Sequence, residues 1–376
     1  MDEVTLLLMV GGWGESPIER ALGGAHQAAA RDLLDTLLGT NLIDRAVIAT
    51  DDAAWAKSVH DLPVEVDLTS PASAFHFGRR LTQLIEHCGA QRVLYSGGGS
   101  APLMSAKRWT NVLRQLKAAD RLVIANNLHS CDWVGFTHAP DAARWIAQQS
   151  SDNGLAWILT NQAAFPCQRL APSAATRFDL DTPIDLLIAR RHPQAGAHLR
   201  RYLNALSWHH PQLEAVIEEM GREGGSLLIA GRVSEQAWGA LNRATRCWIR
   251  VFAEERGMRA SGRLARGEVR SLLADYVDLV GIEGFFDELG SLANGALIDS
   301  RVLLAARGAW PSAADRFRAD LYQWAHITHS FLQRFTRAAA KAEIPIVLGG
   351  HSIVAGGLMA LTESFGENRE ETTCQR

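Results

Sequence analysis

Residues 177–186, RFDLDTPIDL, join an apolar run to the start of a helix. Thr182 can cap that helix, Pro183 suits its first position, and Asp185 falls in its first turn, near the positive end of the helix dipole. The stretch therefore predicts a strand end followed by a helix that begins at Pro183.

Two acidic residues precede this helix, one position apart. Side chains alternate along a strand, so Asp179 and Asp181 would project together if Phe178 and Leu180 point into a core. Two close carboxylates at such a junction suit a divalent cation such as Mg²⁺. The alternative is a well-capped helix preceded by solvated acids, and the local pattern leaves both open.

Upstream of this stretch, apolar runs alternate with segments of helical periodicity. Residues 4–10 form the first buried run, and a helical pattern follows from about 18 to 38. Further strands are predicted at 45–50, 64–68, 92–96 and 121–126, and further helices at 75–87 and 105–118. This alternation predicts an α/β fold with a mostly parallel sheet, helices on both faces and loops gathered at the strand C-termini.

Two of the predicted strands end in glycine-rich loops. Gly11, Gly12 and Gly14 follow the first strand, and a second loop, GGGSAPL, begins at residue 97. A buried strand, a glycine loop and a helix present backbone N–H groups to a phosphate. Both loops are therefore candidate phosphate sites.

Over roughly residues 4–192, the order of these parts resembles the nucleotidyltransferases with a Rossmann-like, GT-A-like fold, relatives of molybdenum-cofactor and phospholactate guanylyltransferases. The matching motifs are LLMVGGWGES, VLYSGGGSAPLMS and FDLDTPIDL, with a looser match at CDWVGF. The resemblance implies an NTP substrate, Mg²⁺ or Mn²⁺, and transfer of a nucleoside monophosphate to a small, phosphorylated acceptor.

The resemblance also implies roles for particular residues. It implies catalytic roles for Asp132, Asp179 and Asp181, metal binding by Asp179 and Asp181, and nucleotide binding by Gly11, Gly12, Gly14, Gly98, Gly99 and Ser100. The chain departs from the family pattern at two places. Glu15 and Ser16 stand where a basic residue is usual, and Gly99 or Ser100 stands where a metal-binding Asp is expected.

The second half reads as another α/β unit, richer in helix, and it resembles no family. The predicted domains are 1–195 and 196–366, with a disordered tail at 367–376. Its strand-end loops supply a candidate anion site: Arg232, Ser234, Arg256, Arg259, Asp299, Arg301, His351 and Ser352. In a parallel sheet such loops line a common crevice, which suits a phosphate. Alternatively, the arginines pair with Glu254, Glu255 and Asp299 to tie the layers together.

Arginines at 259, 263, 266 and 270 follow a spacing of three to four residues. That spacing also allows a second interpretation, a helix with a solvated basic face.

Composition restricts the partners. A net charge of −3 gives no basic footprint, so nucleic acid is not expected. The N-terminal residues read as a strand, so neither a signal peptide nor a membrane span is expected. Five scattered cysteines without metal spacing suit a reducing cytoplasm. The expected partners are a nucleotide and a small-molecule acceptor, with a homodimer left open.

Three functional hypotheses remain at this stage. The first is the nucleotidyltransferase-like enzyme that the resemblance implies. The second is a binding or scaffold protein that kept the fold and lost the chemistry, since the two departures remove a phosphate-neutralising cation and a metal ligand. The third places the active centre in the second domain.

Overall fold

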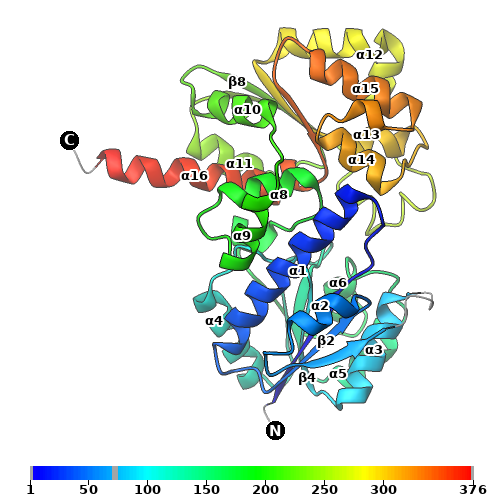
Figure 1. Ribbon diagram of the computed structural model, residues 1–376, viewed down its shortest axis with the longest axis vertical. Coiled ribbons are helices and arrows are strands. Elements are labelled where there is room, and N and C mark those ends of the chain that lie inside the picture. The colour runs from blue at the N-terminus through cyan, green and yellow to red at the C-terminus, as the bar shows by residue number, and fades with distance from the viewer. Residues whose placement is uncertain (1–2, 70–74, 374–376) are drawn as a thin grey trace. The chain divides into compact units, whose positions relative to one another are not determined.

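The computed structural model describes residues 3–69 and 75–373, which form two compact units (Figure 1). The first unit comprises residues up to 13, 23–176 and 194–202. The second comprises 14–22, 177–193 and 203 onward. The units therefore interleave along the chain, and helices α1, α7 and α9 each contribute residues to both.

The first unit is built on a seven-stranded sheet in the order β3-β2-β1-β4-β6-β5-β7, in which β6 alone runs antiparallel to its neighbours. The strands are β1 (Val4–Val10), β2 (Arg45–Thr50), β3 (Glu65–Leu68), β4 (Arg92–Gly97), β5 (Val123–Ala125), β6 (Trp133–Phe136) and β7 (Cys167–Arg169). The predicted mostly parallel α/β sheet is confirmed.

Helices cover both faces of this sheet, because the central strands are apolar on both sides. In β1, Leu7 packs into one buried cluster, whereas Leu6 and Leu8 pack into the other. The helices are α1 (Pro17–Leu38), α2 (Ala53–Ser58), α3 (Phe77–Cys88), α4 (Ala106–Ala118), α5 (Ala139–Ile146), α6 (Leu155–Asn161), α7 (Ala174–Arg177) and α9 (Ala197–Ala205).

The second unit contains a four-stranded parallel sheet in the order β11-β10-β8-β9. Its strands are β8 (Ser226–Gly231), β9 (Trp248–Ala253), β10 (Gly295–Asp299) and β11 (Ile346–Gly349). Its helices are α8 (Pro183–Arg191), α10 (Pro211–Gly221), α11 (Glu235–Ala244), α12 (Leu272–Leu292), α13 (Ser300–Ala306), α14 (Ala313–Asp320), α15 (Ser330–Lys341) and α16 (Gly356–Thr373), with short 3₁₀ turns η1 (Trp324–His326) and η2 (Ser352–Val354). The core includes Phe285 of α12 and Phe335 of α15 against β8, β10 and β11. The second α/β unit is thus present, and it is rich in helix.

The unit boundaries differ from the predicted break between residues 195 and 196. Helix α8 belongs to the second unit because it packs on the start of α16. A Cβ at Gly356 would lie 2.0 Å from the carbonyl oxygen of Arg177, and a Cβ at Gly357 would lie 3.1 Å from Cδ1 of Ile188. Glycine at both positions lets the two segments approach closely. The tail predicted at 367–376 is helical to Thr373, and residues 374–376 lie outside the described residues.

The predicted helix with a basic face near residues 259–270 is wrong. Residues 256–267 form successive turns. Gly257, Gly262 and Gly267 have φ of +73°, +74° and +68°, the left-handed conformation that ends a helix. The four arginines therefore do not share one face of a continuous helix.

Over the described part of the chain, no helix combines the length and apolar character needed to cross a membrane. Cys88, Cys131, Cys167 and Cys247 carry free thiols, and Cys374 lies outside the described residues.

Candidate functional site

In the first unit, the loop after β1 already holds a negative charge. The backbone N–H of Gly12 donates to the Asp51 carboxylate, at 3.1 Å to Oδ2 and 3.3 Å to Oδ1. A Cβ at Gly11 would lie 2.2 Å from Oδ1 of the same carboxylate. Asp51, at the C-terminal end of β2, therefore occupies the place beside this N–H that a phosphate oxygen could take.

The loop after β4 lies next to the loop after β1, because β1 and β4 pair in parallel. A Cβ at Gly98 would lie 3.0 Å from Cγ2 of Val10, and a Cβ at Gly99 would lie 2.4 Å from Cε1 of His26. The His26 ring in turn packs edge-on against Trp13, with centroids 4.3 Å apart. Side chains thus fill the space beside this glycine loop.

Ser100 and Asp132 complete this end of the first sheet. The Ser100 hydroxyl donates to the carbonyl oxygen of Asp132 at 2.8 Å, and the Asp132 carboxylate accepts from the Asn126 amide at 2.7 Å. The structure therefore brings together six of the predicted residues, Gly11, Gly12, Gly98, Gly99, Ser100 and Asp132. Of their polar groups, the Gly12 N–H, the Ser100 hydroxyl and the Asp132 carboxylate are already bonded to protein partners.

The remaining predicted residues of the nucleotide and metal sites, Gly14, Asp179 and Asp181, belong to the second unit. Beside Gly14, a Cβ would lie 2.3 Å from Oε1 of Glu19, so an acid also abuts this glycine. Phe178 and Leu180 are buried, whereas Asp181 is exposed. Burial alternates as predicted, with Asp179 half-buried, but residues 178–180 form no strand of either sheet, because helix α7 ends at Arg177 directly before them.

A metal finds no complete set of ligands around these two acids. Among the side chains that the structure describes, no three of His, Cys, Asp or Glu are arranged to hold an ion. Asp181 also lies within electrostatic reach of Arg259 and His351. An arginine so close opposes a divalent cation, so the donor set of this unit alone does not fit Mg²⁺.

Helix α8 begins at Pro183, as predicted, but its first-turn acid is buried instead of solvated. Asp185 is fully buried, and its Oδ2 accepts from the N–H and the hydroxyl of Thr182 at 2.7 and 2.9 Å. Burial, and then repulsion from Asp181, raise the pKa of Asp185 to about 8. This acid is therefore mostly protonated at neutral pH.

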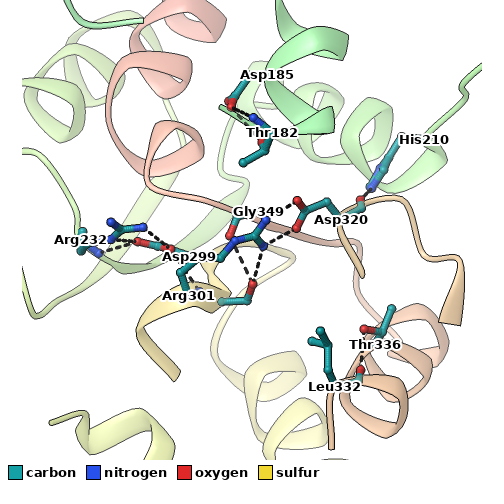
Figure 2. Close-up of polar contacts among 11 residues, drawn as sticks. Thr182, Asp185, His210, Arg232, Asp299, Arg301, Asp320, Leu332, Thr336 and Gly349 are labelled. Atoms are coloured by element: carbon teal, nitrogen blue, oxygen red, sulfur yellow. Dashed lines mark hydrogen bonds and ion pairs between the residues drawn. The ribbon is translucent and has the colours of Figure 1, made fainter. Parts of the chain in front are cut away.

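Two buried ion pairs stand at the C-terminal ends of β8 and β10 (Figure 2). Arg232 donates to both oxygens of Asp299, at 2.6 and 3.1 Å. Although burial alone would raise it, the pKa of Asp299 is lowered by the Arg232 guanidinium. The predicted pairing of an arginine with Asp299 is thus present.

The second pair joins Arg301 to Asp320, with both contacts at 2.5 Å. Burial raises the pKa of Asp320 to about 6 against the effect of Arg301, so the pair is charged at pH 7. His210 lies behind it: its Nδ1 accepts from the Leu213 N–H, so its Nε2–H donates to the Asp320 carbonyl at 3.0 Å. These contacts fix the Arg301 guanidinium in place (Figure 2).

Two further arginines, Arg259 and Arg316, lie within electrostatic reach of these pairs, and Arg256 lies within reach of His351. Arg256 and Arg259 are exposed, and Arg316 is half-buried. The Arg316 and Arg259 guanidinium carbons lie 4.7 and 5.8 Å from the centre of the Trp310 ring. Burial and the charges of Arg301 and Arg259 lower the pKa of Arg316 to about 10. Like charges are therefore held close together here.

The loop after β11 adds His351 and Ser352. Burial, and then the charge of Arg232, lower the pKa of His351 to about 4, so its imidazole is neutral at pH 7. Ser352 is buried and accepts the Gly357 N–H at 3.1 Å, and Ser234 accepts the Ala237 N–H at 3.4 Å. The two hydroxyls thus support helix starts.

The sequence missed several residues of these sites. Asp51 directly follows the predicted strand at 45–50, but nothing in the sequence connected it with Gly12. Asp320, Arg316 and Trp310 lie in or near α14, outside the strand-end loops on which the prediction relied. The one available signal for Asp320 was its position at the end of a short helical pattern, which is weak.

Comparison with known proteins found no matching family model and no matching curated protein. Solved structures do match. A nucleotidyl transferase from Methanothermobacter thermautotroptrophicus is 13% identical, and the match covers 53% of this chain and 98% of that one with a TM-score of 0.41. A putative nucleotide-diphospho-sugar transferase from Desulfovibrio desulfuricans G20 is 15% identical, covering 55% and 96%, with a TM-score of 0.38. A cytidylyltransferase from Leptospira borgpetersenii is 10% identical, covering 55% and 98%, with a TM-score of 0.35.

The structures found are thus named as nucleotidyltransferases, the class that the sequence motifs resemble, and each covers about half of the chain. The residues above, and not these distant likenesses, carry the functional argument that follows.

Proposed function

We propose that this protein is a nucleotidyltransferase-like enzyme. Its first unit would bind an NTP, and a nucleoside monophosphate would pass to a small phosphorylated acceptor with release of pyrophosphate. A cytoplasmic location belongs to the same proposal. So does Mg²⁺ or Mn²⁺, which the phosphates of the nucleotide would have to help hold, because Asp179 and Asp181 alone do not form a complete site. The second unit would bind an anionic ligand.

The observation that carries this proposal is the carboxylate on the Gly12 N–H. A glycine N–H that follows a buried strand is a known position for a phosphate oxygen, and here it binds the Asp51 carboxylate at 3.1 Å. A Cβ at Gly12 would meet no atom within 4 Å, so there is room beside the loop. The loop therefore binds an anion, and Asp51 takes the place of the ligand.

The test is calorimetry with GTP, CTP, ATP and UTP, with and without Mg²⁺, on the wild type and Asp51→Asn. We expect one nucleotide to bind, and to bind several-fold more tightly to the variant, because the like charge that competes for Gly12 is gone. Asp120→Asn is the control, since that exposed acid in the same unit should not affect affinity.

Absence of binding by both the wild type and Asp51→Asn would contradict the proposal. Weaker binding by Asp51→Asn would show instead that the carboxylate helps to hold the nucleotide. If binding is found, release of pyrophosphate in an acceptor screen would test the transfer step.

A second candidate is a binding protein that kept the fold of the first unit without its chemistry. The specific observation in its favour is the filled loop after β4, where His26 abuts Gly99 and the Ser100 hydroxyl is bonded to a backbone carbonyl. Neither residue supplies the carboxylate that a metal prefers. The same calorimetry separates the two candidates, because this one predicts no nucleotide binding.

A further inference from the structure

The sheet of the second unit has a switch point between two of its strands. From β8, the chain goes first to β9 on one side and then to β10 and β11 on the other, as the order β11-β10-β8-β9 requires. In open parallel sheets, ligands bind outside the carboxyl ends of the strands at which the direction reverses. Here these ends are Gly231 and Asp299, and Arg232 directly follows the first of them.

Positive charge gathers around this switch point. Arg259 lies within electrostatic reach of Arg232 and Arg301, and Arg316 lies within reach of Arg301 and Arg259. Asp299 and Asp320 are already paired with Arg232 and Arg301. Carboxylates within reach include Asp181 near Arg259, Glu19 near Arg316, and Glu254, which follows β9 and lies within electrostatic reach of Asp299.

Two of the arginines have hydrogen-bond donors to spare. In the part of the chain that the structure describes, neither the Arg256 nor the Arg259 guanidinium donates a hydrogen bond to a protein group, and both residues are exposed. The alternative interpretation of these arginines was that they pair with acids of the same unit. It accounts for Arg232 and Arg301, and for Arg263, which binds Glu255. It does not account for Arg256 and Arg259.

The frame around these donors is rigid. Arg232 and Arg301 are each fixed by two contacts to one carboxylate, and the Arg301 N–H also donates to Asp299 at 3.3 Å. A neutral His351 adds no positive charge and can accept or donate one hydrogen bond. Several guanidinium donors, some fixed and some without a protein acceptor among the described residues, suit a dianion with three acceptor oxygens better than a single carboxylate.

We infer that the switch point of the second unit is a binding site for a phosphate group carried by a small molecule, with Arg259 and Arg256 as its direct ligands. This site is separate from the loops of the first unit. The inference therefore holds whether or not the first unit transfers a nucleotide.

The experiment is calorimetry of the full-length protein with inorganic phosphate and, in parallel, with acetate, at low salt and pH 7.5. We expect phosphate to bind more tightly than acetate, and Arg259→Gln to weaken phosphate binding by about tenfold or more, since a charge-assisted hydrogen bond is lost. Arg256→Gln should weaken it as well. Thermal melting of each variant shows that it is folded; both arginines are exposed, so folding should be intact.

Arg246→Gln is the matched control, because Arg246 is an exposed arginine of the same unit that pairs with Glu223. It should leave phosphate affinity unchanged. The inference is overturned if the wild type does not bind phosphate, if acetate binds equally well, or if Arg246→Gln weakens binding as much as Arg259→Gln does. Phosphate binding that is lost in Arg259→Gln belongs to this site, whereas binding gained in Asp51→Asn and kept when Arg259→Gln is added belongs to the first unit. Failure of this site and failure of the proposed nucleotide site are therefore distinguishable.

Discussion

The two units treat charge at their strand ends differently. In the first unit, the backbone N–H of Gly12 donates a hydrogen bond to the carboxylate of Asp51, which directly follows the neighbouring strand β2. In the second, the carboxylates of Asp299 and Asp320 each pair with one arginine, and Arg256 and Arg259 have no protein acceptor among the described residues. A strand end whose charge is balanced within the fold needs no ligand to be stable. One with surplus positive charge is stabilised when an anion binds.

The difference extends to burial. The two ion pairs at the strand ends of the second unit, Arg232–Asp299 and Arg301–Asp320, are buried. The Arg45–Glu65 pair of the first unit, at 2.7 Å, has side chains 34% and 54% exposed. Buried pairs are expensive to break, and exposed ones contribute little. The predictions below test this contrast and the fit of the first unit's loops.

The largest effect is expected for Asp320→Ala. It leaves the Arg301 guanidinium buried without its carboxylate, and loss of one partner of a buried pair costs about 3–5 kcal/mol. Urea unfolding followed by tryptophan fluorescence and circular dichroism measures the change. Glu65→Ala in the first unit is the control, with an expected loss below about 1 kcal/mol.

Asp320→Ala alone could prevent folding, so a paired substitution completes the test. Arg301→Met combined with Asp320→Leu removes both charges together and should recover most of the lost stability. Equal losses for Asp320→Ala and Glu65→Ala would contradict the contrast between the two units.

The second prediction concerns pH and the buried acid at the start of α8. The folded pKa of Asp185, about 8, lies above its unfolded value of about 3.9. Between these values the folded state holds a proton that the unfolded state has lost. This group's contribution therefore lowers the free energy of unfolding as pH rises, by about 1.4 kcal/mol per unit. Asp185→Asn should remove that slope.

Denaturation of wild type and variant at pH 5.5, 7 and 8.5 measures the difference. Asparagine can still accept from Thr182, so the cap is preserved. Asp141→Asn is the control, because Asp141 is an exposed acid in the first turn of α5. If the two variants change the pH dependence of the free energy of unfolding equally, the burial of Asp185 does not raise its pKa in the folded state and the prediction is wrong.

The fold was largely predictable because its strands are continuous apolar runs bounded by glycine. β1, β2 and β4 were each predicted to within one residue at either end. The order of strands and the antiparallel direction of β6 were not predictable from spacing, because register and direction depend on long-range pairing.

The sites were predictable only as sets of strand-end residues. That Arg232 meets Asp299 followed from the topology of a parallel sheet. Tertiary packing, which local sequence does not encode, brings the Asp51 carboxylate to the Gly12 N–H. The same kind of packing buries Asp185 and raises its pKa, so that the carboxyl is mostly protonated at neutral pH. The basic helix near residue 259 failed for a local reason, the three left-handed glycines.

The smallest effect is expected for Gly99→Ala in the first unit. The new Cβ would lie 2.4 Å from Cε1 of His26, whose ring is held edge-on against Trp13, so the ring must shift. Such overpacking costs about 1–3 kcal/mol. Urea unfolding of Gly99→Ala, His26→Ala and the double variant gives the coupling free energy between the two positions, and His26→Ala should relieve most of the cost of Gly99→Ala.

Gly290→Ala is the control, since a Cβ there meets nothing within 4 Å. If Gly99→Ala costs no more than the control, the loop after β4 is plastic enough to move His26 aside. The first unit would then have room for a phosphate at both glycine loops. The two units would differ in how easily their strand-end loops move, and not in how their charges are balanced.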